Sequence, residues 1–230
     1  MSDQFSAWQL ILSGDPALFA IVRLSIVVSL TAVALAALVG MPLGALLALT
    51  RFPGRSALVV LLNAFMGLPP VVVGLAVYLL LSRSGPLGAM GILFTPTAMV
   101  IAQTILIVPI IAALTRQTVE DLWIEYRDEL AAMDVSPLGR VATLLWDARL
   151  SLMTALLAGL GRAAAEVGAV MIVGGNIDGF TRTTTTAIAL ETSKGNLPLA
   201  MGLGLVLVGL VLAVNAAAWG VRYWSDRQAG

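Results

Sequence analysis

Residues 116–149 read RQTVEDLWIEYRDELAAMDVSPLGRVATLLWDAR, and these 34 positions hold 11 of the 26 charged residues in the chain (13 basic and 13 acidic). Long segments that are free of charge lie on both sides of this stretch, such as 56–82 before it and 195–221 after it. A membrane protein that concentrates its charge in one internal loop exposes that loop to water, where a partner can bind it. We call residues 116–149 the polar island.

The composition favours a membrane protein and excludes several kinds of chemistry. Of 230 residues, 59% are hydrophobic and 11% are charged, whereas a soluble domain has about 25% charged residues. The chain has no Cys and no His, and its one lysine, Lys194, lies outside any P-loop pattern. We therefore expect an all-α polytopic membrane protein that is not an enzyme, with no catalytic residue, no metal and no cofactor of its own. The net charge of zero gives no indication of nucleic-acid binding.

Charge-free runs indicate five membrane-spanning helices, with six as an alternative count. Since about 20 helical residues cross the hydrocarbon core, each run is long enough to span. The expected spans are 17–50, 56–82, 96–116, 150–174 and 197–221. An N-terminal segment 1–16, a loop 117–149 with a helix-turn-helix, a loop 175–196 and a tail 223–230 complete the chain. Pro69 and Pro70 predict a helix break in the second span, because proline removes a backbone hydrogen bond.

The distribution of basic residues predicts the orientation. If the polar island is cytoplasmic, eight basic residues lie on the cytoplasmic side and three on the outer side, as the positive-inside rule requires. The eight are Arg51, Arg55, Arg116, Arg127, Arg140, Arg149, Arg222 and Arg227, and the three are Arg83, Arg182 and Lys194. The N-terminus and the loop 175–196 are then outside, and the C-terminus is inside.

The polar island reads as two helices. Apolar residues recur with helical spacing from Leu122, which predicts an amphipathic helix whose apolar face is free for a partner. Ser136 and Pro137 suit the start of a second helix, which we expect to run on into the fourth span. A connector resting on the lipid interface is the alternative. It is disfavoured because anionic headgroups would repel the many acids of the island.

The segment 128–137 resembles the "EAA" loop of ABC-importer permeases, an acidic-Ala-Ala stretch followed by a Gly and then by Ser-Pro. In that family the loop forms a coupling helix in a cleft of the cytoplasmic ATPase. Aligned through Ser136 and Pro137, the family Glu falls on Asp128 and the family Gly on Asp134. The resemblance implies that these residues dock the ATPase: Tyr126, Asp128, Glu129, Leu130, Met133, Asp134, Ser136 and Pro137.

The fourth span and the loop after it hold the candidate pathway residues. Arg162 and Glu166 are four residues apart and can pair on one helix face. Ionisable residues inside a span usually face a water-filled path, although an ion pair that serves packing is the alternative. The hydroxyls of Thr183, Thr184, Thr185 and Thr186 could donate to an anion. Gly174 to Asn176 should end the helix, and 187–193 should form a short helix that does not span.

The residues 166–177 and the run from Phe180 to Thr186 resemble the permeases of tungstate importers, in the molybdate/tungstate/sulfate group of type I ABC permeases. The resemblance implies a type I ABC permease fold over 17–222 in a prokaryotic inner membrane. It implies import of an oxyanion, tungstate first, with molybdate or sulfate as alternatives. The implied partners are a second copy of the chain, cytoplasmic ATPase subunits that use the ATP, an extracytoplasmic oxyanion-binding protein and membrane lipid.

A secondary transporter or channel that works without ATP is the alternative from another class. It would not need a large acidic docking helix, and five spans show no duplicated halves. A dependence of uptake on a separate ATPase distinguishes the two classes.

Overall fold

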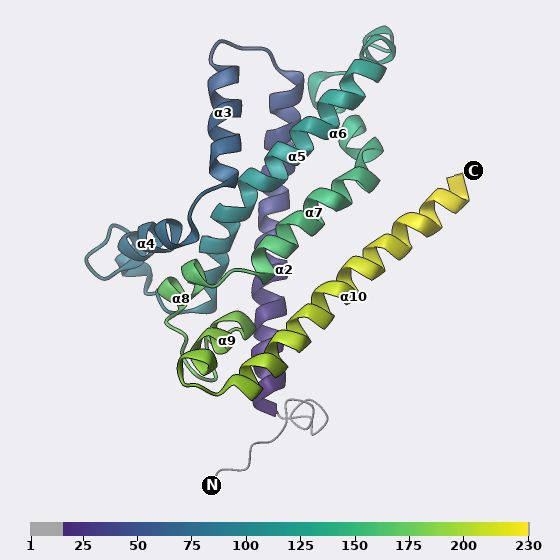
Figure 1. The fold of residues 1–230 in the computed structure, drawn as a ribbon. Coiled ribbons are helices and arrows are strands. Elements are labelled where there is room, and N and C mark those ends of the chain that lie inside the picture. The colour runs from purple at the N-terminus through teal and green to yellow at the C-terminus, as the bar shows by residue number, and fades with distance from the viewer. Residues whose placement is uncertain (1–15, 230) are drawn as a thin grey trace. The chain divides into compact units, whose positions relative to one another are not determined.

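Helices build the part of the chain that the structure describes (Figure 1). This computed structural model describes residues 16–229, with side chains placed for residue 16 and residues 18–220. Nearly all of the expected segment 1–16 therefore lies outside the described residues, as do the side chains of the expected tail 223–230. In chain order the elements are α2 (Pro16–Leu49), α3 (Arg55–Met66), α4 (Pro70–Leu81), η1 (Gly88–Met90), α5 (Pro96–Ala132), α6 (Pro137–Asp147), α7 (Arg149–Ala164), α8 (Gly168–Gly174), α9 (Thr184–Ser193) and α10 (Leu197–Ala229). No strand occurs in residues 16–229, as expected for an all-α protein.

The described helices can cross a membrane three to five times. By length and composition, Leu18–Leu49 of α2, Pro96–Ala132 and Leu197–Gly220 of α10 are each able to span. Two bent pairs, α3 with α4 and α6 with α7, raise the number to five if each pair is one span. The expected count of five lies within this range, but the second bent pair covers 137–164, whereas the expected fourth span is 150–174.

Three details of the expected helices are wrong. The helix of the polar island does not begin at Leu122, because α5 continues from Pro96 to Ala132 without a break. No Gly or Pro lies between residues 110 and 132 to stop it. The helix that restarts at Pro137 ends at Asp147 and meets α7 at 76°, so it does not run on into the fourth span. The fourth span itself is interrupted between Ala164 and Gly168.

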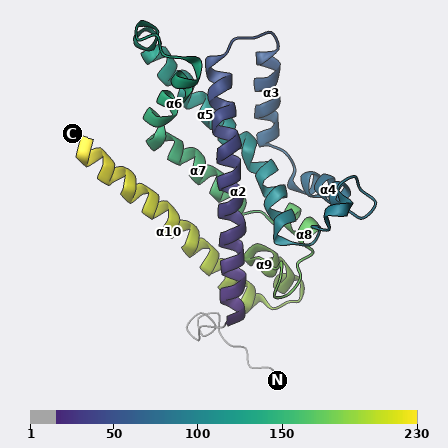
Figure 2. The same cartoon turned by 180° about the vertical axis from the view of Figure 1, so that it is seen from behind.

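The chain forms two compact units, which we describe one at a time. The island unit comprises residues 32–68 and 104–160. In it, α3 lies alongside the second half of α2, as Figures 1 and 2 both show, and Leu62 packs against Leu47. A Cβ added at Gly44 would lie 2.4 Å from the carbonyl oxygen of Ala112, so α2 and α5 are in backbone contact. Gly40 and Gly44 form the G-x-x-x-G spacing that permits such contacts between membrane helices.

The described residues of the loop unit are 16–31, 69–103 and 161–229. Its centre is the contact of α4 with α8, where a Cβ added at Gly74 would lie 2.7 Å from the Cα of Ala169. The backbone N–H of Phe94 donates to the carbonyl of Val173 at 2.9 Å and ties the loop before α5 to α8. The short helix α9 packs against α10. A close glycine contact and a backbone hydrogen bond therefore hold α8 in this unit.

Candidate functional site

A fixed turn ends α5 in the island unit. The N–H of Asp134 donates to the carbonyl of Ala131, and the N–H of Val135 donates to that of Leu130. These two bonds form a Schellman motif, and Val135 packs against the cluster that contains Leu130, as is usual for this motif. Asp134 has a φ of +49°. This left-handed conformation favours glycine, the residue that the EAA loop has at the aligned position, and Asp adopts it more readily than most other residues.

The next helix begins two residues later. Ser136 is the N-cap of α6, and its hydroxyl accepts the N–H of Gly139 at 3.2 Å. Pro137 takes the first helical position, as its fixed φ favours. The guanidinium of Arg140 donates through Nε to the carbonyl of Val135 at 2.9 Å and closes the turn from the other side. We call residues Met133–Leu138 the docking turn.

The apolar face of the polar island is covered by the chain itself, and the expectation that it is free is wrong. Leu130 is 4% exposed and forms a cluster with Ala45 of α2, Val119 of α5 and Leu144 of α6. Leu122 and Tyr126 pack against the same cluster. Because α2 and α6 bury this face, Leu130 offers no surface to another protein in this structure.

The residues predicted to dock a partner divide into an inner and an outer group. The exposed ones are Asp128, Glu129, Met133, Asp134, Ser136 and Pro137, while Tyr126 is half-buried and Leu130 is buried. Leu138, which the sequence interpretation missed, is the most exposed large apolar residue of the docking turn at 82%, followed by Met133 at 67%. Two apolar side chains therefore project from a turn whose inner face is packed.

The interrupted fourth span is organised by one carboxylate in the loop unit. Glu166 is 3% exposed, and one of its oxygens accepts from the guanidinium of Arg162 at 2.6 Å. Its other oxygen accepts the backbone N–H of Ala169, in the first turn of α8, at 2.9 Å. Glu166 thus neutralises Arg162 and also satisfies a backbone donor that the helix start leaves without a partner. The side chain of Arg162 is 26% exposed.

Two further side chains satisfy the backbone at this break. The amide nitrogen of Gln103 in α5 donates to the carbonyl of Ala163 at 3.3 Å, and the hydroxyl of Thr185 donates to the carbonyl of Glu166 at 2.8 Å. Irregular backbone at membrane depth needs such internal partners. Gln103 was not predicted; a single amide inside an apolar span is the sequence signal that could have identified it.

The four predicted threonines hold α9. Thr183 and Thr186 form a reciprocal capping box at its N-terminus. The backbone N–H of Thr184 donates to the hydroxyl of Ser25 in α2 at 2.7 Å, and the two hydroxyls lie 3.0 Å apart. Thr183, Thr184 and Thr186 are buried, and all four hydroxyls have partners within the chain. In this structure their hydroxyls therefore position α9, and none is a free donor.

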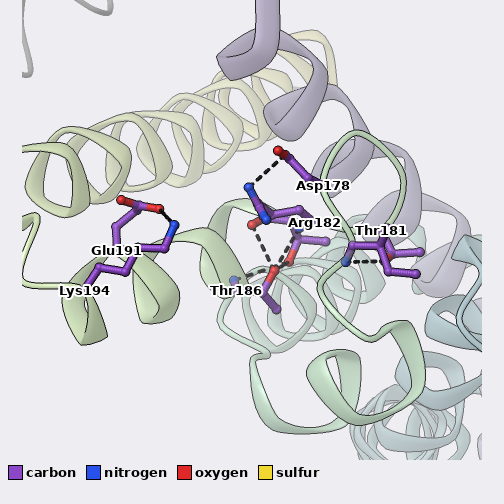
Figure 3. A network of polar contacts seen from close by, with 8 residues as sticks. Asp178, Thr181, Arg182, Thr186, Glu191 and Lys194 are labelled. Carbon is purple, nitrogen blue, oxygen red and sulfur yellow. Dashed lines mark hydrogen bonds and ion pairs between the residues drawn. The ribbon is translucent and has the colours of Figure 1, made fainter.

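The loop before α9 is fixed by its own polar side chains (Figure 3). The hydroxyl of Thr181 donates to the carbonyl of Gly174 at 2.5 Å and accepts the N–H of Ile177 at 2.9 Å. Arg182 pairs with Asp178 at 2.7 Å. The helix α8 ends at Gly174, as expected from the sequence.

The turn after α9 carries a third acid–base contact, also shown in Figure 3. The ammonium of Lys194 donates to Glu191 at 2.8 Å, and the amide nitrogen of Asn196 donates to its second oxygen at 3.2 Å. The hydrogen bond from Lys194 is the main cause that holds the pKa of Glu191 below its usual range, against the opposing effect of burial. Glu191 is therefore ionised at neutral pH.

No family model matches the chain. It is 43% identical over 218 residues to a probable anion ABC transporter permease protein of Haloferax volcanii, with 93% of each chain covered. It is 39% identical over 217 residues to the tungstate uptake system permease protein TupB of Peptoclostridium acidaminophilum, covering 94% of this chain and 95% of the relative. A sulfate transport system permease protein of Synechocystis, CysW, is 30% identical over 210 residues, covering 87% of this chain and 75% of the relative. With its apolar helices and these relatives, the chain is a multi-pass membrane protein that belongs to the family of ABC transporter permeases.

Proposed function

We propose that the chain is the permease subunit of an ATP-driven importer for tungstate. Two relatives at 39% and 40% identity are named tungstate uptake permeases, which supports this oxyanion over molybdate or sulfate. Two copies of the chain would form the pathway over residues 17–222. Separate ATPase subunits would use the ATP, since the sequence contains no P-loop. An extracytoplasmic binding protein would deliver the anion.

The geometry of the docking turn is the observation that supports coupling to an ATPase. Its backbone is fixed by the Schellman motif and the cap of α6, and its inner face is buried around Leu130. Met133 and Leu138 project outward among exposed acids. A rigid turn with two apolar side chains fits a groove on another protein, and the surrounding charges can set the register.

The docking role is tested by the double variant Met133→Glu with Leu138→Glu. We expect the ATPase subunits to be lost from the purified permease, while the permease itself stays folded because both side chains are exposed. Ile124→Glu is the control: Ile124 is 74% exposed on α5, which ends at Ala132, directly before Met133. At 100° per residue it faces about 180° away from the direction of Met133. Recovery of the ATPase at the parental level with the double variant would contradict the proposal.

The proposed orientation places the docking turn in the cytoplasm and the loop 175–196 outside. The chain has no native cysteine, so single cysteines report accessibility directly. We expect Ser136→Cys to react with a membrane-impermeant thiol reagent only from the cytoplasmic side, and Asp178→Cys only from the outside. Both positions are exposed. The reverse labelling would invert the topology.

The transported anion is tested with permease, ATPase and binding protein reconstituted together. We expect uptake of labelled tungstate that requires ATP, with weaker competition by molybdate and sulfate. Uptake by the permease alone, without ATP, would identify a secondary transporter or channel. Equal or stronger competition by molybdate or sulfate would change the assigned oxyanion.

Arg162 is the side chain that we propose to contact the anion in the pathway. It is partly exposed, whereas its partner Glu166 is enclosed and the nearby threonine hydroxyls are engaged. Because Arg162→Gln alone would leave the buried Glu166 unpaired, the test uses Arg162→Gln combined with Glu166→Gln. We expect the combined variant to lower uptake more than it lowers the yield of the assembled complex, and Arg162→Lys to retain part of the uptake because it retains the charge. Parental uptake with the combined variant would make Arg162 a packing residue.

A further inference from the structure

One guanidinium in the island unit joins three helices. Arg55 is the first residue of α3, directly after the turn that follows α2. Its Nε donates to the carbonyl of Leu47, in the last turn of α2, at 2.7 Å. A terminal nitrogen of the same guanidinium pairs with Glu120 of α5. The end of α2, the start of α3 and the middle of α5 are therefore connected through one side chain.

Glu120 uses both carboxylate oxygens. One accepts from Arg55, and the other accepts from Arg116, one turn earlier in α5, at 2.5 Å. The side chains of Arg55, Glu120 and Arg116 are 28%, 31% and 17% exposed, so the group is partly shielded from water. Charge-assisted bonds in such a setting are shorter and stronger than those of a fully exposed pair. We call these three residues the charge clamp.

Besides the clamp, α3 is held in the island unit by a small apolar contact. Leu62 is the one buried residue of this helix, all of which the structure describes, and it packs with Leu47, Ala112 and Ala113. Other large apolar residues of α3 are 38% to 66% exposed: Leu58, Val60, Leu61, Phe65 and Met66. Since α3 has one buried apolar residue and one half-buried one, Val59, the bond between Arg55 and Glu120 is an important part of its attachment to α5.

The same helix α5 continues into the docking turn. It runs unbroken from Pro96 to Ala132, past Glu120, and ends in the Schellman motif. On the other side of the clamp, α3 continues along the chain through the break at residues 67–69 into α4. A movement of the docking turn is thus carried by α5 to Glu120, and the clamp is the polar link from there to α3.

We propose that Arg55, Glu120 and Arg116 are positioning residues that transmit movement of the docking turn to α3 during transport. The proposal rests on the function proposed above. The clamp contacts neither the anion nor the ATPase; it keeps α3 moving together with α5. Loss of the clamp therefore allows ATP hydrolysis to proceed with less transport per ATP.

The test measures tungstate uptake per ATP hydrolysed by the reconstituted complex of permease, ATPase and binding protein. The variants are Arg55→Gln, Glu120→Gln and the two combined. Arg51→Gln and Asp121→Asn are the matched controls, since both residues are exposed neighbours of the clamp. We expect parental amounts of copurified ATPase and a fall in the uptake-to-hydrolysis ratio of about 3- to 30-fold, the range typical of residues that carry coupling between sites.

The double variant tests whether Arg55 and Glu120 act through the same bond. If Arg55 and Glu120 act through one bond, the combined variant lowers the ratio no further than the single variants. A clamp that served only stability would lower the melting temperature and the yield of complex but leave the ratio unchanged, and that result overturns the proposal. A parental complex without ATP-dependent tungstate uptake instead overturns the proposed function, so the two failures are distinguishable.

Discussion

The docking turn and the interrupted fourth span are both breaks between helices, but different forces hold them. The docking turn uses backbone hydrogen bonds and an apolar cluster around Leu130, and its polar side chains remain exposed. The break at residues 165–167 uses the side chains of Glu166, Gln103 and Thr185 to satisfy charges and backbone groups. A turn in water can leave polar groups to the solvent, whereas a break within a span must supply every partner from the chain.

This contrast teaches which substitutions should matter at each break. At the break in the fourth span the side chains of Glu166, Gln103 and Thr185 are structural, and removing one leaves a buried group without a partner. Beside the docking turn, the buried Leu130 of α5 is structural, and the exposed residues of the turn are free to serve a partner protein. The predictions below test that division, beginning with the largest expected effect.

Replacement of the buried carboxylate in the fourth span should be the most damaging change. Glu166→Gln leaves Arg162 without its counter-ion and should lower the free energy of unfolding by about 3–5 kcal/mol, toward the lower end because Arg162 is 26% exposed. Thermal unfolding of the detergent-solubilised permease measures the change. The combined variant Arg162→Gln with Glu166→Gln removes both charges and should recover much of the loss. A double variant as unstable as the single one would show that the ion pair is not what stabilises the break.

Around the docking turn the largest loss of stability should come from substitution of Leu130, the buried leucine near the end of α5. Leu130→Ala removes buried methyl groups and should cost about 2–3 kcal/mol in the same measurement, because the cavity can collapse only in part. Met133→Ala, at an exposed position three residues later, should change stability by no more than about 0.5 kcal/mol. If the two variants were equally destabilising, the division into an inner and an outer face would be wrong.

Loss of the hydrogen bond between α2 and α9 should destabilise the protein less than loss of Glu166, and again because a polar group loses its partner. Ser25→Ala leaves the backbone N–H of Thr184 without its acceptor and should cost about 1–2 kcal/mol. Hydrogen exchange at the start of α9 should accelerate, because the N-terminus of this helix loses its attachment to α2. Ser29→Ala, one turn further along α2 at another buried serine, is the matched control. Unchanged hydrogen exchange in α9 with Ser25→Ala would show that Ser25 does not hold the start of α9.

The backbone of the docking turn can be tested at its left-handed residue. Asp134→Val should cost about 1 kcal/mol, because a β-branched residue adopts a positive φ poorly. Asp134→Gly should stay within about 0.5 kcal/mol of the parent, since the relief of strain is offset by the larger entropy of glycine in the unfolded chain. A melting curve for each variant distinguishes the two substitutions. If glycine were as harmful as valine, the aspartate side chain rather than the φ would be what the turn requires.

The sequence predicted those features that depend on neighbouring residues. The cap at Ser136 and Pro137, the end of α8 at Gly174 and the spacing of Arg162 and Glu166 all follow from local rules, and each occurs in the structure. The continuity of α5 could also have been inferred, since no helix breaker separates Arg116 from Leu122. The interpretation placed a boundary there because charge begins there, but charge marks the edge of a membrane and does not end a helix.

Features that depend on distant residues could not be read from the pattern. An apolar face at helical spacing predicts that something covers it, but the cover was α2 and α6 of the same chain rather than a partner. The threonines looked like free donors because their acceptors, such as Ser25, lie far away in the sequence. Arg55 and Glu120 are 65 positions apart, and each seemed an ordinary charge at a membrane edge. Tertiary contacts assign these roles, and periodicity alone does not contain them.

The smallest expected effect concerns the exposed end of the loop unit and depends on pH. The pKa of Glu191 is lowered chiefly by the hydrogen bond from Lys194, so its folded value lies below its unfolded one. The resulting stabilisation is complete at neutral pH, above the unfolded pKa, and is lost as the pH falls through the lowered folded value. Glu191→Gln should therefore increase hydrogen exchange in the turn after α9 at neutral pH, and the difference from the parent should vanish in acid below the usual glutamate range. A difference that persisted in that acid would mean that hydrogen bonding by the Glu191 side chain, rather than its charge, fixes the turn. The turn after α9 would then resemble the break at residues 165–167 in its hydrogen bonding but not in its electrostatics.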